Sequence, residues 1–189
     1  MLRKMLFSAL SLAAAGLLLP GVSAGDGKND RKINVDLTGF EEVPVVITTG
    51  NGEVKLTINE SARTIDYVLT FADLQADVTQ AHIHVAQKSV NGGIILWLCQ
   101  TSAIPAPPAV AGLTPFCDAA PNTPRAGTVS GTLKDANAVV NVTQQLAAGN
   151  LEDVLIAIAA GKAYANVHTV VSTGGEIRGQ LTHDHGRTD

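Results

Sequence analysis

The sequence predicts an all-β protein, an antiparallel Greek-key β-sandwich of about seven or eight strands with one short helix. Short segments in which apolar and polar residues alternate recur along most of the chain, as in strands that have one buried face. Turns rich in glycine, asparagine and proline separate these segments. Residues 150–161 differ, because their apolar positions have helical spacing. The sequence contains no internal repeat and no sign of a second domain.

Residues 1–24 have the parts of a secretory signal peptide. A short basic start is followed by an apolar run over residues 5–19, and residues 22–24, Val-Ser-Ala, form a small-residue cleavage site. The apolar run is short for a membrane span, and an uncleaved anchor is the alternative. Residues 25–32 are predicted to be a polar leader.

Residues 33–182 are predicted to form the domain. Its first strand is expected at residues 33–38, where apolar and polar residues alternate. The alternating segments 53–58 and 64–71 are joined by a short polar link and should form a hairpin. Pro44 cannot donate a backbone hydrogen bond to a neighbouring strand, so it should lie at an edge or a bulge.

The middle of the chain contains two further strands and a proline-rich segment. Residues 80–85 alternate, and the apolar run 94–99 is interpreted as a buried strand. The proline-rich insert, residues 101–124, has no periodicity and is predicted to be a loop. In an exported protein the pair Cys99 and Cys117 is most simply a disulfide, which would contribute about 3 kcal/mol to stability. Two unpaired buried thiols are the alternative.

The last part of the chain begins with a strand at residues 126–133 and continues with the helix at 150–161. The helix has an asparagine N-cap, two acidic residues in its first turn and a glycine at its end. Its apolar side is expected to cover the core of the sheet rather than bind a partner. Strands at 163–170 and 176–182 should complete the domain, and residues 183–189 form a polar tail.

Composition and charge limit the classes of partner. The 189 residues are 46% hydrophobic, which is enough for one core. The net charge is −4 and the calculated pI is near 5.7, and the chain lacks a basic cluster of the kind that binds nucleic acid. After cleavage of the signal peptide no membrane span is expected. The partner should therefore be an extracytoplasmic protein or a small ligand.

Three histidines are candidates for a metal site. His82 and His84 share one face of their strand, and their Cα atoms should lie about 6.5–7 Å apart. His168 lies in another alternating segment. Imidazole groups suit zinc or copper, and three ligands plus a water would form an open site. The alternative is that the histidines are structural and hydrogen-bond to the backbone or to Glu176 and Arg178.

Other residues extend this candidate site. Tyr164 and Asn166 share a face with His168 and are placed to orient it, as partners of a ligand histidine do. His183 and His185 repeat the His-x-His spacing, but they lie in the tail, where a site would have to be ordered on binding.

Glu176 and Arg178 form a second polar pair. They share a face of one predicted strand two residues apart, and we expect a structural ion pair rather than a catalytic one. Arg178 could instead pair across strands with Asp66 or Glu42.

Four motifs in this order resemble the CHRD (chordin-type) domain. They are TGFEEVP at 38–44, AHIH at 81–84, AYANVHT at 163–169 and GEIRGQL at 175–181. The family occurs in chordin, an extracellular antagonist of bone morphogenetic proteins, and in single-domain secreted microbial proteins, and this chain resembles the second type. The resemblance implies a fold and an extracytoplasmic location more than an activity. The proline-rich insert departs from the family pattern, and nothing corresponds to the cysteine-rich modules of chordin, so growth-factor binding is not implied.

Two hypotheses about function follow. The first is a secreted or periplasmic CHRD-domain protein that acts as a non-catalytic binding or interaction module. The second is a secreted metal-binding protein, a carrier or a redox enzyme, that holds zinc or copper at the three histidines. The sequence has no nucleophile elbow, phosphate loop or His-Glu-x-x-His motif, so no catalytic residue is predicted. Copper/zinc superoxide dismutases also carry His-x-His on a β-sandwich, but their two-metal site needs more ligands than these three.

Overall fold

The structure is a computed structural model that describes residues 30–117 and 125–182. The predicted signal peptide at residues 1–24 and the predicted tail at 183–189, with its two histidines, lie outside the described residues. The last part of the proline-rich insert, 118–124, also lies outside them.

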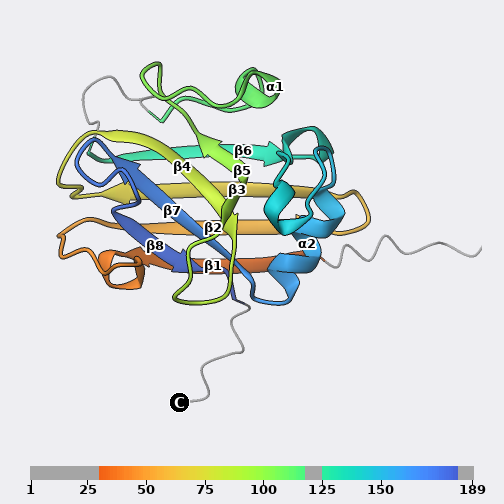
Figure 1. Cartoon of the computed structure of the whole chain (residues 1–189), viewed down its shortest axis with the longest axis horizontal. Helices are drawn as coiled ribbons and strands as arrows, with labels where there is room; N and C mark the ends of the chain where they lie inside the picture. Colours follow the sequence, from red (N-terminus) through yellow and green to blue (C-terminus); the bar gives the residue numbers. More distant parts are fainter. Residues whose placement is uncertain (1–29, 118–124, 183–189) are drawn as a thin grey trace, which may run out of the picture.

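The described residues form eight antiparallel strands, which confirms the all-β prediction. The strands are β1 Arg31–Thr38, β2 Asn51–Asn59, β3 Thr64–Ala72, β4 Val78–Val85, β5 Gly93–Cys99, β6 Gly127–Leu133, β7 Ala163–Thr169 and β8 Ile177–Gln180. They are hydrogen-bonded in the order β5-β4-β7-β8-β1-β2-β3-β6, so the sheet is continuous and nearly closed into a barrel. It is folded into two layers, and Figure 1 shows β4, β5, β7 and β8 in front of β1, β2, β3 and β6. Strand β6 pairs with β3 although β4 and β5 come between them in the chain, as in a Greek key.

Side-chain alternation decides which residues fill the space between the two layers. In β4, Ala81 and Ile83 are fully buried in the core, and Ala165 and Val167 of β7 join them there. The alternate residues of these two strands therefore point to the opposite, outer face of the front layer. Most strands begin or end within two residues of the predicted bounds; β1 begins at Arg31, inside the predicted polar leader.

Two α-helices and three short 3-10 segments complete the described fold. They are α1 Pro108–Ala111, α2 Leu151–Ala159, η1 Gly39–Glu41, η2 Asp135–Asn137 and η3 Val142–Gln144. The predicted helix is confirmed as α2; the Asn150 side chain accepts a hydrogen bond from the Asp153 backbone N–H, and the buried face of the helix packs into the core. No helix among the described residues is long and apolar enough to cross a membrane.

The prediction that the insert is only a loop is wrong, because it contains α1. The side chain of Gln100 organises it: the amide NH₂ donates to the carbonyl oxygens of Ala111 and Thr114 at 2.7 and 2.6 Å, and the amide oxygen accepts from Ala106 N–H at 2.9 Å. The sequence shows no periodicity here because the insert is held by hydrogen bonds to one buried side-chain amide. In a helix or strand the backbone itself would supply these bonds.

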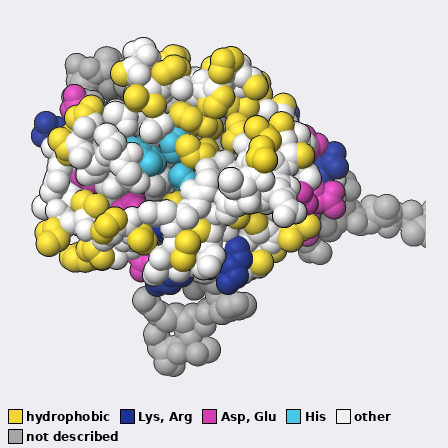
Figure 2. Space-filling view, viewed as in Figure 1, with side chains coloured by type: hydrophobic (Ala, Val, Ile, Leu, Met, Phe, Trp, Pro, Cys, Tyr) yellow, Lys and Arg dark blue, Asp and Glu magenta, His cyan; other side chains and the backbone are white. Residues whose placement is uncertain are grey.

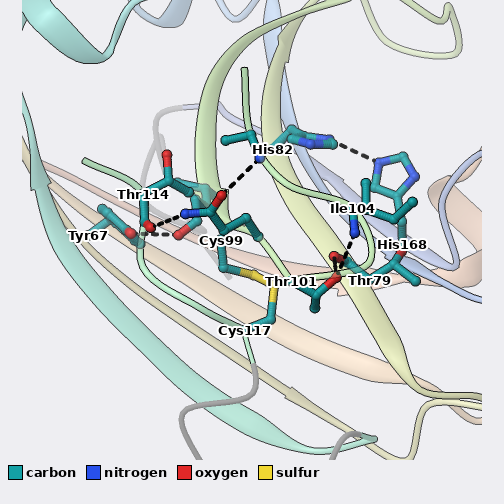
Figure 3. Close-up of a disulfide and its surroundings, with 12 residues drawn as sticks. Tyr67, Thr79, His82, Cys99, Thr101, Ile104, Thr114, Cys117 and His168 are labelled. Atoms are coloured by element: carbon teal, nitrogen blue, oxygen red, sulfur yellow. Dashed lines mark hydrogen bonds between the residues drawn. A yellow bond between two sulfur atoms is a disulfide. The ribbon is translucent and has the colours of Figure 1, made fainter. Parts of the chain in front are cut away.

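The cysteines form the predicted disulfide, which joins the end of β5 to the insert (Figure 3). Its two cysteines are 18 residues apart in the chain. Replacing both cysteines with alanine should lower the free energy of unfolding by about 3 kcal/mol, because the unfolded chain regains the entropy of an open loop. Urea unfolding of the variant and of wild type with dithiothreitol measures this, and equal stability with and without the bond would contradict it.

Candidate metal centre

The outer face of the front layer carries a row of polar and aromatic side chains. The strand register places His82 opposite Trp97 of β5 on one side and opposite Asn166 of β7 on the other. Asn166 is in turn opposite Arg178 of β8, and in the next row His84 is opposite Tyr164. Antiparallel pairing brings such opposed side chains to about 5 Å of one another.

This outer face is nevertheless covered. The exposed fractions of His82, His84 and His168, which we call the histidine cluster, are 0%, 6% and 6%. Gly92, before β5, and Thr173, before β8, contact the cluster through their backbone carbonyls. Figure 2 shows the histidine rings, in cyan, in a small hollow on this face, with acidic side chains in magenta close by.

Hydrogen bonds to backbone carbonyls fix the tautomers of two of the rings. Nδ1 of His84 lies 3.0 Å from the carbonyl oxygen of Gly92, and Nδ1 of His168 lies 2.9 Å from that of Thr173. A carbonyl oxygen can only accept, so each Nδ1 carries the proton and donates it. In a neutral ring the other nitrogen, Nε2, then presents a lone pair.

The lone pairs of His84 and His168 point at the same amide oxygen. The Nε2 atoms of His84 and His168 each lie 3.0 Å from Oδ1 of Asn166, and Nε2 of His168 also lies 3.2 Å from Nδ1 of His82. One potential ligand atom from each histidine lies within 4.8 Å of the other two. Nε2 of His82 is buried and has no hydrogen-bond partner among the described residues. The cluster is thus rich in acceptors and poor in protons.

Burial keeps the three rings neutral. It lowers the pKa of His82 well below the usual value, with a further lowering from the neighbouring His168 and His84. Burial lowers the pKa of His84 to about 4, and it also lowers the pKa of His168. Neutral imidazole is the form that binds metal ions.

The same shift makes stability depend on pH. Between pH 6.5, near the pKa of histidine in an unfolded chain, and pH 4, the unfolded state binds a proton that folded His84 does not. Metal-free protein should therefore lose stability as the pH falls through this window, by about 2 kcal/mol between pH 7 and pH 5 from His84 alone. Urea unfolding in the presence of EDTA measures it, with His84→Gln as the less pH-dependent control. A flat profile in wild type would contradict the neutral cluster.

Aromatic side chains enclose the cluster. The Tyr164 ring stacks on His84 with the centroids 4.7 Å apart and the planes 1° from parallel. The guanidinium of Arg178 lies 3.4 Å from the centroid of the Tyr164 ring. The Trp97 ring contacts His82 edge to face, with the ring centroids 4.2 Å apart. Sequence reasoning missed Trp97, although its place in the alternation of β5, opposite to the core residues Leu96 and Leu98, was a usable signal.

The expected ion pair between Glu176 and Arg178 does not form among the described residues. The Glu176 carboxylate accepts hydrogen bonds from Thr48, Gln75 and Thr169 instead. The Arg178 guanidinium donates to Asn91 Oδ1 at 3.1 Å and to the Val90 carbonyl oxygen at 3.0 Å. The two side chains therefore hydrogen-bond to different loops. They do not share a strand face, because β8 begins only at Ile177 and Glu176 still belongs to the preceding turn.

The Glu42 carboxylate lies close to Asn166, the residue that contacts two of the histidines. Burial raises its pKa to about 7, against the opposing effects of Arg178 and Asn166. Its exposed fraction is 5%, and its Oε1 has no hydrogen-bond partner among the described residues. Glu42 and Asp66 were the two cross-strand partners suggested for Arg178. The positive charge of Arg178 acts on Glu42, where it lowers the pKa, whereas Asp66 is exposed and accepts a hydrogen bond from Thr132. The sequence feature that could have pointed to Glu42 is its place in the motif at residues 38–44.

Gly175 is required by the close packing around Asn166 and Glu42. Its φ is +125°, and a Cβ there would overlap Oε1 of Glu42 and Nδ2 of Asn166. Gly175→Ala should therefore cost about 2 kcal/mol of unfolding free energy through backbone strain and displaced side chains. Gly174→Ala, where a Cβ meets nothing within 4 Å, is the matched control. Equal stability of the two variants would contradict this packing.

Comparison with known proteins identifies the family. A family model described as "CHRD domain" matches residues 33–181, nearly all of the predicted domain. No match was found in the search of curated proteins or in the search of solved structures.

Proposed function

The chain belongs to the CHRD domain family, and we propose that it is an exported protein that binds one zinc or copper ion through His82, His84 and His168. This is the second of the two sequence hypotheses, and the interaction-module hypothesis in its metal-free form is the alternative. Export is supported by the disulfide, which persists in oxidising compartments, and by the signal-peptide pattern of the sequence.

The observation that carries the proposal is the convergence of acceptor atoms. Nε2 of His84 and Nε2 of His168 face the same amide oxygen, and neither nitrogen carries a proton in the neutral ring. Acceptors that face one another in a buried place repel, and the cost is removed when a cation lies between them. A protonated ring would also remove it, but burial disfavours that form in all three histidines.

Two further features support a metal ion. Histidines that bind metal usually donate their other ring N–H to a carbonyl or carboxylate, and His84 and His168 both do so. The donor set of imidazoles suits zinc and copper rather than magnesium or calcium. Among the described residues no carbonyl accepts from the His82 ring, which packs instead against Trp97 and the other two histidine rings.

The competing arrangement is a metal-free hydrogen-bond cluster. If the Asn166 amide is turned over, its NH₂ can donate to both Nε2 atoms, and the histidines would only hold β4 against β7. This arrangement predicts a folded protein that takes up no metal. It therefore makes the metal content of the protein decisive.

The experiment is metal analysis of the mature chain purified without a His tag and exposed to zinc or copper. We expect one ion per chain in wild type and no stoichiometric ion in His82→Ala, His84→Ala or His168→Ala. The double variant His183→Ala/His185→Ala tests the other candidate pair and should keep its ion. A metal-free wild type, with cluster variants that lose only stability, would establish the structural alternative.

A further inference from the structure

We infer that the Asn166 side-chain oxygen is a fourth ligand of the ion, which closes the site to water, and that Glu42 and Gly175 hold the amide in the ligating orientation. This inference rests on the proposed function and deepens it, because three histidines alone would leave an open position. It concerns what the site can do: an open site can activate a water or bind a small anion, whereas a closed site holds its ion.

The donor spacing supports four ligands. An ion bonded tetrahedrally at about 2.0–2.1 Å keeps its ligand atoms about 3.3 Å apart. His168 Nε2 lies 3.2 Å from His82 Nδ1 and 3.0 Å from Asn166 Oδ1, and Oδ1 also lies 3.0 Å from His84 Nε2. Three edges of a tetrahedron are therefore already close to the required length, and Oδ1 is a corner shared by two of them.

Strand pairing and burial hold Asn166 in place. Its strand β7 is paired on both sides, with His82 and Arg178 as its neighbours across the ladders. Its exposed fraction is 2%. The side chain therefore cannot swing away to admit a solvent ligand without opening the layer.

Glu42 determines which end of the amide faces the histidines. Oε1 of Glu42 and Nδ2 of Asn166 both lie beside Gly175, where a Cβ would be 2.2 and 2.7 Å from them, so the missing Cβ lets both atoms approach. Oε1 is buried and has no hydrogen-bond partner among the described residues, so the Asn166 NH₂ beside it is the donor available to it. A carboxylate oxygen prefers the NH₂ end of an amide, because the reverse orientation would bring two oxygen atoms together. Oδ1 is then directed at the histidine cluster, as the structure has it.

Glu42 is thus a positioning residue that acts through Asn166. It comes from the end of η1, in the segment 38–44 that the fold and the three-histidine site leave unexplained. Partners of this kind, which contact a ligand and not the ion, typically change metal affinity by about 10–100-fold when they are removed.

Cobalt(II) in place of zinc tests the inference, since its visible spectrum reports coordination and its response to azide reports an open position. We expect the wild-type cobalt protein to show an intense four-coordinate spectrum that azide leaves unchanged. In Asn166→Ala azide should change the spectrum, and Asn166→Asp, which keeps an oxygen donor, should behave as wild type. Glu42→Gln should bind cobalt about 10–100-fold more weakly and gain an azide response.

The outcomes separate the two proposals. A wild-type cobalt protein that binds azide as Asn166→Ala does would overturn the fourth ligand and leave the three-histidine site standing. Unchanged affinity and azide response in Glu42→Gln would overturn the role of Glu42. If wild type binds no cobalt, zinc or copper, or if His168→Ala binds as well as wild type, the proposed function itself fails. Should Asn166→Ala not fold, the azide response of wild type alone still decides the main point.

Discussion

Zinc or copper should raise the free energy of unfolding by about 4 kcal/mol when the free ion stands at a thousand times its dissociation constant. The reason is that the site exists only in the folded chain. His82 and His84 come from β4 and His168 from β7, and those strands meet through long-range pairing. Urea unfolding in metal-buffered solution and in EDTA measures the difference.

The controls for this result come from the chain itself. His168→Ala should lose the metal-dependent gain, and the tail variant His183→Ala/His185→Ala should retain it. An ion that stabilises wild type and His168→Ala equally would be bound elsewhere. An ion that stabilises neither, at concentrations that saturate other three-histidine sites, would contradict the proposed function.

Glu176→Ala should cost about 4 kcal/mol of unfolding free energy, although Glu176 touches no histidine. The carboxylate is 0% exposed and accepts hydrogen bonds from Thr48 Oγ1 at 2.7 Å, Gln75 N–H at 2.8 Å and Thr169 Oγ1 at 2.8 Å. Its removal leaves three buried or part-buried donors without a partner, each at a cost of about 1–3 kcal/mol. Urea unfolding measures the loss.

Two further variants separate this loss from a general effect of removing a carboxylate. Glu176→Gln keeps one acceptor oxygen and should cost about half as much. The exposed Glu152→Ala, in the first turn of α2, should change stability by less than about 1 kcal/mol. A loss below about 1 kcal/mol in Glu176→Ala would show that water replaces the carboxylate. The loops that hold Thr48 and Gln75 would then be independent of the sheet.

The faces of the strands could be predicted from the sequence, because alternation is a local property. Ala81 and Ile83 on one side, and His82 and His84 on the other, follow from a period of two. The same rule places Asn166 beside His168 on β7. Alternation predicts which side chains share one face of a strand, but it does not predict which strands are neighbours in the sheet.

The histidine side of β4 lies next to the Asn166 side of β7 only through long-range strand pairing, which no local sequence pattern contains. Strands β4 and β7 are neighbours only because the chain crosses between the layers twice before it returns to β4. The register that puts His82 opposite Asn166 is set by that pairing, and a shift by one residue would turn the histidines into the core. The juxtaposition was therefore a hypothesis until the structure placed the strands.

The parts played by Glu42 and Glu176 could not be read from spacing. Both residues lie in turns, so alternation does not apply to their side chains. The sequence suggested an ion pair for Glu176 and Arg178 because they are two residues apart. The structure gives each of them neutral partners, since a buried turn needs acceptors and donors for its backbone and hydroxyl groups.

Anomalous diffraction from crystals of the zinc-loaded protein tests the central claim most directly. We expect one peak at the zinc edge, about 2.0–2.1 Å from Nε2 of His84, Nε2 of His168 and Nδ1 of His82. A peak confined to the tail histidines, or none at full zinc exposure with the rings in contact as they are here, would contradict a metal site between these strands.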